Sequence, residues 1–299
     1  YDVRRPPFAA PKRGHNMGRD FIVLNKLHNV FDKTPVTYAY SEDVEILGAP
    51  FYIMNKVEGI ILTAREAKER KVSPNDFNKI ADTWLDAFVE LHEADYKAAG
   101  LESLGNPEGY VERQVKNWGK QYLAAATEEV ISAQKVMSWM ENNKPRNYDY
   151  SLIHNDYKYD NVVFVNDQWE KIVAVLDWEM CTLGDPLMDL GTSLGYWTTS
   201  SDADFLKHGL PSPTTMAGNP SRTEIVHRYA LKSGRNINNL TFYFAYGLFK
   251  IAVIAQQIYY RFKHGYTKDP RFEGLNKVSA LCCNTAWNAI QKDRIDELY

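Results

Sequence analysis

The 299-residue chain has few cysteines and lacks the patterns that mark zinc or P-loop nucleotide sites. Its three cysteines are Cys181, Cys282 and Cys283, and neither a C-x-x-C pair nor an H-E-x-x-H sequence suggests zinc. An odd number of cysteines, two of them adjacent, indicates a reducing, cytoplasmic location. A G-x-x-x-x-G-K-[ST] loop is also missing, which excludes a P-loop enzyme, and no G-x-G-x-x-G loop occurs.

An excess of charge of one sign and a long apolar run are missing as well. Lys and Arg number 35 against 38 Asp and Glu, so the net charge of −3 favours neither nucleic acid nor a membrane as a partner. The most apolar stretch, 240–260, contains Lys250 and two glutamines, and it predicts a buried core helix. No signal peptide is recognisable. Because the first residue is Tyr1 rather than Met, we expect part of the natural N-terminus to lie outside this sequence.

Apolar periodicity divides the chain into a short strand-rich part and a long helical part. The β-prone segments are 1–4, 36–40, 51–57, 152–153, 162–165 and 172–176. The helical patterns are 17–27, 73–94, 110–125, 128–142 and most of the chain after 189. This order predicts an α+β, two-lobed fold. Residues 1–57 would form a small mixed lobe with an antiparallel sheet, incomplete at its N-terminus, and residues 58–299 a larger, mainly helical lobe.

The most informative residues lie in and after the middle strands. Asp156 and Asn161 are five apart and follow His154, which is the spacing of the kinase catalytic loop H-x-D-x-x-x-x-N. Asp177 closes the apolar run 172–176, as the metal-binding Asp of a kinase does. Phosphoryl transfer needs a carboxylate to orient the acceptor hydroxyl and oxygen ligands for Mg²⁺. We therefore predict that Asp156 is catalytic and that Asn161 and Asp177 bind the metal.

Each of these residues also has a simpler structural interpretation. An isolated Asp often caps a local turn, and Asp177 could merely end a strand. The combination of His154, Asp156 and Asp177 between apolar strands favours function, because a carboxylate after a buried strand needs a partner. His154 is expected to hold the loop through backbone hydrogen bonds, and Asp189 to cap a helix or brace the loop. Glu179 could reach a second metal through water.

These motifs resemble those of the aminoglycoside phosphotransferase and choline kinase-like family, which shares the protein-kinase fold. The resemblance spans essentially the whole chain and rests on segments 51–59, 154–161 and 177–191. It is strongest with the branch that occurs alone or fused to acyl-CoA dehydrogenases. The resemblance implies ATP and Mg²⁺ as cofactors and a nucleotide site in the small lobe.

The resemblance also assigns roles to individual positions of the small lobe. Arg4 stands where the family places a phosphate-binding cation, and Asp20 where a helix carries the Glu that pairs with it. Met54 would line the adenine pocket, and the backbones of Asn55 and Val57 would bond the base. Asp20 is one methylene shorter than Glu, which puts the pairing with Arg4 in doubt.

The resemblance implies a phosphotransferase that moves the γ-phosphate of ATP to the hydroxyl of a small molecule. Residues 191–299 carry 13 Lys and Arg against 8 Asp and Glu, which leaves 22 against 30 for residues 1–190. A basic C-terminal segment favours an anionic acceptor such as a hydroxyacyl-CoA or a hydroxy acid. The alternatives are a non-catalytic nucleotide-binding regulatory module, which could associate with an acyl-CoA dehydrogenase, and an aminoglycoside or choline kinase.

Overall fold

The computed structural model describes residues 1–6 and 16–299, and packing groups them into two compact units. The mixed unit comprises residues 1–106 and 151–183, and the helical unit comprises residues 107–150 and 184–299. Helices and small antiparallel sheets together confirm the predicted α+β class. The predicted lobe boundary at residue 57 stays a prediction, because the two units are defined by packing, whereas the predicted lobes were defined by function.

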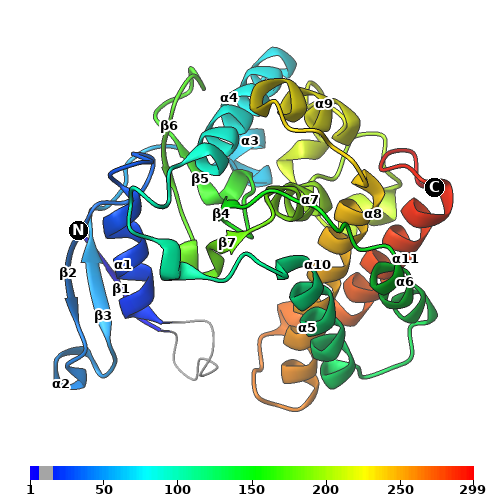
Figure 1. Cartoon of the computed structure of the whole chain (residues 1–299). Helices are drawn as coiled ribbons and strands as arrows, with labels where there is room; N and C mark the ends of the chain where they lie inside the picture. Colours follow the sequence, from blue (N-terminus) through cyan, green and yellow to red (C-terminus); the bar gives the residue numbers. More distant parts are fainter. Residues whose placement is uncertain (7–15) are drawn as a thin grey trace. The chain divides into compact units, whose positions relative to one another are not determined.

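The mixed unit contains short strands and the helices that cover them (Figure 1). Its strands are β1 (Asp2–Arg4), β2 (Thr37–Ser41), β3 (Phe51–Met54), β4 (Ser151–Ile153), β5 (Val162–Phe164), β6 (Ile172–Val175) and β7 (Thr182–Gly184, whose last residue belongs to the helical unit). Its α-helices are α1 (Met17–Leu27), α2 (Val44–Leu47), α3 (Ala64–Glu69) and α4 (Pro74–Glu93). Its 3₁₀ turns are η1 (Glu102–Leu104), η2 (Tyr159–Asn161) and η3 (Trp178–Met180).

One antiparallel sheet has the strand order β1-β3-β2, with α1 packed beside it (Figure 1). Arg4 lies opposite Tyr52, so the register of β1 with β3 fixes the backbone position of Arg4. Phe21 of α1 stacks on Tyr40 at 5.8 Å between ring centroids. The predicted pairing of segments 36–40 and 51–57 is confirmed. Gly48, expected in the turn between them, instead ends α2 in the left-handed conformation, with φ of 74°.

Helix α4 begins as the sequence predicted, with Ser73 as N-cap and Pro74 as the first helical residue. Ser73 and the Asp76 side chain form a reciprocal capping box, which satisfies backbone donors at the helix start. The buried face of α4 contacts β4 and β6. The hydroxyl of Tyr157 donates to the Trp84 carbonyl at 2.8 Å, and its ring stacks on Phe88 at 4.2 Å. These contacts tie the segment after β4 to the core.

The helical unit is built around two long helices, α10 and α11, which pack together (Figure 1). Its α-helices are α5 (Tyr110–Ala125), α6 (Ile131–Asn142), α7 (Pro186–Tyr196), α8 (Asp204–Gly209), α9 (Arg222–Ser233), α10 (Leu240–Lys263) and α11 (Leu275–Lys292), with 3₁₀ turns η4 (Pro213–Thr215) and η5 (Pro270–Phe272). The sequence placed α5 correctly and started α6 three residues too early.

Helices α7 and α10 cross at glycines. A Cβ atom on Gly191 would lie 2.1 Å from the carbonyl oxygen of Tyr243, and one on Gly247 would lie 2.0 Å from the carbonyl oxygen of Gly191. Most residues of α10 from Thr241 to Gln256 are buried, so the predicted core helix is confirmed. No helix in residues 1–6 and 16–299 combines the length and apolarity that a membrane crossing requires.

A buried ion pair joins α9 to the C-terminal segment. The guanidinium of Arg222 donates to both carboxylate oxygens of Asp202, at 3.1 and 2.5 Å, and each side chain is 2% exposed. Arg222 also donates to the Ile295 carbonyl at 3.2 Å and to Asp296 at 3.4 Å, and it lies over the Phe244 ring. One side chain therefore connects three segments of the helical unit.

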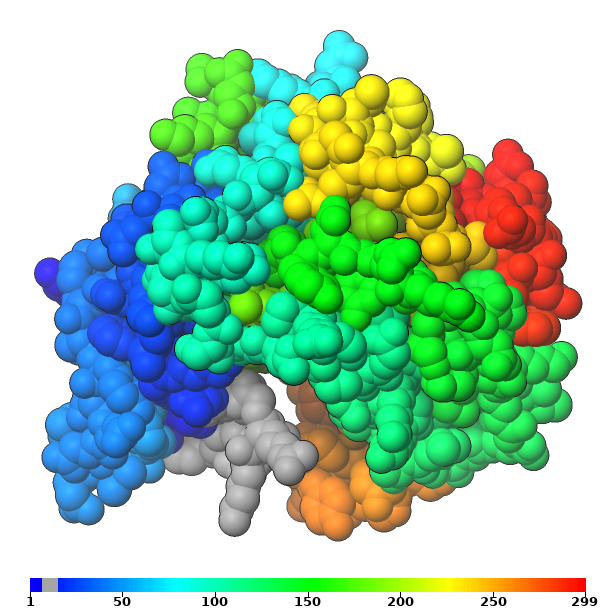
Figure 2. Space-filling model, viewed as in Figure 1, coloured from blue at the N-terminus to red at the C-terminus, as the bar shows by residue number. Residues whose placement is uncertain are grey.

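A second buried carboxylate lies at the start of α7. Asp185 is the N-cap of this helix, whereas Asp189 is the residue that the sequence suggests for that role. One oxygen of Asp185 accepts from the Leu187 amide at 2.8 Å, and the other accepts from the Tyr243 hydroxyl at 2.8 Å. Asp185 also lines a hollow of about 300 Å³ between segments 147–149 and 235–239. Figure 2 shows the segment before β4, in green, against the loop that leads into α10, in gold.

Candidate active site

The loop after β4 is held in shape by a buried imidazole. His154 Nε2 lies 2.8 Å from the Leu176 carbonyl oxygen, and the Asp156 amide donates to His154 Nδ1 at 3.2 Å. Nδ1 must therefore be unprotonated and Nε2 must carry the hydrogen. The next residue, Asn155, adopts φ of 69° and its side chain donates to the Met180 carbonyl. The bracing role predicted for His154 is confirmed.

Two side chains surround the carboxylate of Asp156. Asn161 Nδ2 donates to the backbone oxygen and to Oδ2 of Asp156, both at 2.8 Å. Lys158 Nζ lies 3.1 Å from Oδ2, and the Asp156 side chain remains 22% exposed. The loop thus presents a carboxylate whose orientation is fixed and whose charge is balanced by a neighbouring cation. Such a group can orient a hydroxyl or accept its proton.

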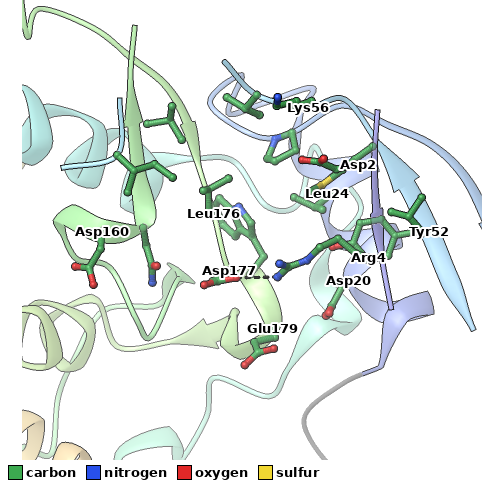
Figure 3. A pocket seen from close by; sticks show the side chains of 18 residues that line it. Asp2, Arg4, Asp20, Leu24, Tyr52, Lys56, Asp160, Leu176, Asp177 and Glu179 are labelled. Atoms are coloured by element: carbon green, nitrogen blue, oxygen red, sulfur yellow. Dashed lines mark hydrogen bonds and ion pairs between the residues drawn. The ribbon is translucent and has the colours of Figure 1, made fainter. Parts of the chain in front are cut away.

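Asp177 follows β6 in a conformation that few non-glycine residues adopt, with φ of 61° and ψ of 58°. Arg4 Nη2 donates to Asp177 Oδ1 at 2.8 Å, the ion pair drawn as a dashed line in Figure 3. Burial alone would lower the pKa of Arg4, but the Asp177 carboxylate outweighs it and raises the pKa. Two residues 173 apart in sequence therefore meet, as phosphate-binding and metal-binding groups must.

Asp20 is not the partner of Arg4. No ion pair joins these two side chains within the described residues, and Arg19 Nη1 lies 3.5 Å from Asp20 Oδ1 instead. Asp20 is 6% exposed, and burial raises the pKa of its carboxyl to about 6, while Arg19 lowers it and Glu179 raises it further. Arg4 pairs with Asp177 instead.

The predicted nucleotide residues line a cavity of about 490 Å³ in the mixed unit (Figure 3). Its polar part includes Arg4, Asp20, Asn161, Asp177, Asp160 and Glu179, and its apolar part includes Leu24, Met54, Val57, Ile61, Val163 and Leu176. The predicted residues Asn55 and Asp156 do not line it. Asp156 is nevertheless joined to the cavity by the Asn161 side chain.

The segment after β3 leaves particular backbone groups available to a base. The Asn55 amide donates to the Val36 carbonyl at 2.9 Å, and the Asn55 side chain accepts from the Val36 amide at 2.7 Å. These two hydrogen bonds hold the segment in place. The Asn55 carbonyl oxygen is the atom of this residue that could accept a hydrogen bond from a base. The amide of Val57 donates no hydrogen bond to any residue in 1–6 or 16–299. A donor and an acceptor two residues apart suit the edge of a purine.

The donor set at Asn161 and Asp177 fits a hard cation. Because Asn161 Nδ2 is committed to Asp156, the amide oxygen is the atom left for a metal. Arg4 contacts only Oδ1 of Asp177. One amide and one carboxylate oxygen are ligands that Mg²⁺ accepts together with phosphates and water. Among the described residues, no three His, Cys, Asp or Glu side chains form a metal site by themselves, so phosphate oxygens would have to complete the coordination.

Sequence reasoning missed three residues of this site. Lys158 lies two positions after Asp156, so its place in the loop could have suggested contact with the carboxylate. Asp160 precedes Asn161 and lines the cavity. Arg19 contacts the backbone of Glu179, which lies 160 residues away, and no sequence pattern foretells such a contact.

Comparisons with known proteins define the class. The chain superposes on a candidate aminoglycoside phosphotransferase from Ralstonia eutropha JMP134 with a TM-score of 0.81 at 28% identity, over 97% of this chain and 85% of that one. A choline/ethanolamine kinase family protein from Mesorhizobium loti matches with a TM-score of 0.62 over 98% of this chain and 84% of that one, and its 12% identity shows the fold alone. These matches confirm the predicted kinase-like fold.

A family model described as the phosphotransferase enzyme family matches residues 1–213, and the chain belongs to this family. Over 292 residues the chain is 30% identical to acyl-CoA dehydrogenase family member 10 of Mus musculus, covering 97% of this chain and 27% of the mouse protein. Human acyl-CoA dehydrogenase family member 11 is 32% identical, over 88% of this chain and 33% of the human protein. The chain thus spans about a quarter to a third of the length of these relatives.

Proposed function

We propose that this chain is a small-molecule kinase that uses ATP and Mg²⁺ to phosphorylate a hydroxyl group. The observation that carries this proposal is the single cavity that joins an apolar wall to Arg4, Asn161 and Asp177. An apolar wall suits a nucleobase, and a cation with two oxygen ligands suits phosphates and their metal. Membership of the phosphotransferase enzyme family supports the same reaction class.

Each predicted residue has a distinct role in this proposal. Met54 and Val57 contact the base, with the Asn55 carbonyl and Val57 amide as its hydrogen-bonding partners. Arg4 binds phosphate. Asn161 and Asp177 hold Mg²⁺, which when bound offsets the charge of the phosphates.

Asp156 orients the acceptor hydroxyl and takes its proton as the bond to phosphorus forms. Asn161 keeps the carboxylate of Asp156 in place, with Nδ2 at 2.8 Å from Oδ2. Lys158, at 3.1 Å, limits the repulsion between that carboxylate and the phosphates. Asp20, one residue past Arg19 in α1, shapes the polar end of the cavity without pairing with Arg4.

We further propose an anionic acceptor, a hydroxyacyl-CoA or a related hydroxy acid. The excess of Lys and Arg after residue 191 supports an anion. The pairs of Arg222 with Asp202 and of Arg271 with Asp269 lie within this segment and are already counted, so they do not reduce the excess. The names of the curated relatives, acyl-CoA dehydrogenase family members, favour an acyl-CoA and an association with such a dehydrogenase. Three buried free thiols are consistent with a reducing, cytoplasmic location.

Replacing Asp156 with Asn tests the catalytic role. The variant keeps the size and hydrogen-bonding shape of the side chain but removes the base, so we expect Mg-ATP binding without phosphate transfer. Binding is measured by calorimetry, and transfer with radiolabelled ATP on a panel of hydroxyacyl-CoAs, hydroxy acids, choline and aminoglycosides. Retained transfer by D156N would show that Asp156 is not the base.

The same experiment separates two other functions. A non-catalytic nucleotide-binding module, which the unusual Asp20 permits, predicts Mg-ATP binding by the unmodified chain and no transfer to any acceptor. An aminoglycoside or choline kinase, which the Ralstonia eutropha structure favours, predicts transfer to those cations and none to the anions. Failure of the unmodified chain to bind Mg-ATP at all would overturn the nucleotide site itself.

A further inference from the structure

One side chain of helix α1, Arg19, donates hydrogen bonds to the segment after Asp177. Its Nη1 donates to the Glu179 carbonyl at 3.3 Å, and its Nη2 donates to the Cys181 carbonyl. The same guanidinium lies 3.5 Å from the carboxylate of Asp20. Arg19 is 31% exposed at its side chain, while Asp20 is 8% exposed, so the contact lies at the inner edge of α1.

The segment that accepts hydrogen bonds from Arg19 follows Asp177, a residue with an uncommon backbone conformation. Asp177 is in the left-handed region, and η3 follows it directly. On one side this conformation is held by Trp178, whose indole nitrogen donates to the Val175 carbonyl at 2.8 Å and whose ring lies edge-on to His154. On the other side, the carbonyls of Glu179 and Cys181 accept hydrogen bonds from a residue of α1. Arg19 supplies a donor to each of them.

We propose that Arg19 is a positioning residue for the metal ligand Asp177. It fixes the two carbonyls that follow Asp177, and thereby keeps Asp177 in the wall of the cavity that Asn161 also lines. This inference rests on the proposed function, because it concerns how well the site holds a metal. Through Arg19, α1 would also support the proposed metal ligand without an Arg4–Asp20 ion pair.

The chemistry of the guanidinium explains why an arginine serves here. Its planar fork reaches two carbonyl oxygens and a carboxylate at once, and a lysine ammonium on a flexible stem does not reproduce this geometry. Asp20 interacts with the Arg19 guanidinium rather than with the two carbonyls. Its carboxylate lies beside the guanidinium and orients it, but it touches neither Glu179 nor Cys181 through any hydrogen bond in the described part of the chain.

The test compares metal-dependent nucleotide binding in Arg19→Lys and Arg19→Gln. The full chain is titrated with MgCl₂ at fixed ADP, and bound ADP is measured by equilibrium dialysis, with ADP alone as the metal-free reference. Loss of groups that orient metal ligands lowers metal affinity about 10- to 100-fold. We therefore expect the Mg²⁺ concentration at half-saturation to rise at least tenfold in both variants, with unchanged metal-free ADP binding.

Two matched variants separate positioning from general stability. Lys26→Gln removes another cation of α1, one that donates to the Gly100 carbonyl and does not line the cavity, and it should leave the Mg²⁺ midpoint within about threefold of the unmodified chain. Arg65→Gln removes an exposed arginine that pairs with Glu69 on α3, and it should change nothing. Melting temperatures are recorded for all variants. A purely structural Arg19 would lower the melting temperature while leaving the Mg²⁺ midpoint of the folded protein unchanged.

Each outcome decides between the two proposals. If the unmodified chain shows Mg²⁺-dependent ADP binding and both Arg19 variants keep its midpoint, Arg19 does not position Asp177, and the proposed function stands. If the unmodified chain binds ADP with no dependence on Mg²⁺, the metal site fails and the inference fails with it. If Arg19→Gln does not fold, Arg19→Lys, which retains the charge beside Asp20, carries the test alone.

Discussion

An ion pair in the mixed unit and an ion pair in the helical unit differ greatly in solvent exposure. In the mixed unit, Arg4 and Asp177 are paired at 2.8 Å while 47% and 46% of their side chains stay exposed. In the helical unit, Arg222 and Asp202 are paired while only 2% of each side chain is exposed. An exposed pair contributes about 0–1 kcal/mol to stability and can exchange its partner for a ligand, whereas breaking a buried pair costs about 3–5 kcal/mol. Exposure therefore distinguishes carboxylates that are available to substrates from those that hold the fold.

The largest effect is expected at the buried pair. Arg222→Ala removes four hydrogen bonds and leaves Asp202 charged in the interior, so the free energy of unfolding should fall by about 3–5 kcal/mol. Urea denaturation of the full chain measures this loss. Arg271→Ala, which removes an exposed and equally well paired arginine, should leave the free energy of unfolding almost unchanged. Equal losses in the two variants would contradict the contrast between buried and exposed ion pairs.

The corresponding change in the mixed unit should affect function rather than stability. Asp177→Asn keeps a residue type that tolerates the left-handed backbone, so the fold should be preserved. Phosphate transfer should fall about 10²- to 10³-fold, the typical loss when one preorganised charge is removed from an active site. Steady-state kinetics with the accepted substrate provide the measurement. Asp167→Asn in the β5–β6 turn serves as the matched control, and a similar loss there would point to an indirect cause.

The second buried carboxylate of the helical unit should make stability depend on pH. Burial raises the pKa of Asp185 to about 7, against the lowering effect of hydrogen bonds from Leu187 and Tyr243. Its ordinary value is 3.8, so the folded state binds the proton more tightly than the unfolded state does. This contribution is complete below about pH 4 and is lost as the pH rises through about 7.

Asp185→Asn should therefore stabilise the protein more at pH 8 than at pH 5. At 1.36 kcal/mol for each pKa unit the difference amounts to about 2–4 kcal/mol. Unfolding free energies at the two pH values test it. Asp204→Asn is the control, because Lys207 lowers the pKa of this exposed carboxyl, so it is ionised at both pH values and the variant should change stability equally at pH 5 and pH 8. An Asp185→Asn protein with the pH dependence of the unmodified chain would mean that Asp185 stays charged in the folded state.

The smallest of these effects is expected at the crossing of α7 and α10. Gly191→Ala places a Cβ atom 2.1 Å from the Tyr243 carbonyl oxygen, so the helices must separate, at a cost of about 1–3 kcal/mol. Gly119→Ala in α5 meets only the Met137 sulfur at 3.6 Å and should instead stabilise its helix by about 0.5–1 kcal/mol. The two melting temperatures should move in opposite directions.

Local rules predicted much of the fold. The bounds of α1 and α5 match the apolar spacing, and α4 begins at its Ser73–Pro74 signature. The start of α6 was wrong, because Val130 is extended, with φ of −122° and ψ of 100°, and the connection before it is held by Gln256, which donates to the Ala125 carbonyl and the Thr127 hydroxyl. Such a contact between residues more than 120 positions apart is invisible to periodicity.

The candidate site was predictable to a similar extent. The five-residue spacing of Asp156 and Asn161 allowed their contact to be anticipated, because both lie in one loop. The partner of Arg4 was not predictable from spacing, since its choice of Asp177 over Asp20 depends on how β1 and α1 pack. Local chemistry thus nominated the candidate residues, while tertiary packing decided which of them touch.

The buried imidazole of His154 has a consequence for behaviour in acid. Its Nδ1 accepts the amide hydrogen of Asp156, so a second proton on the ring would turn an acceptor into a donor and set two hydrogens against each other. The ring is fully buried, so the added charge would also lack water. A second proton on the His154 ring would therefore disturb the loop that bears Asp156. Loss of activity in acid should coincide with a change in loop geometry.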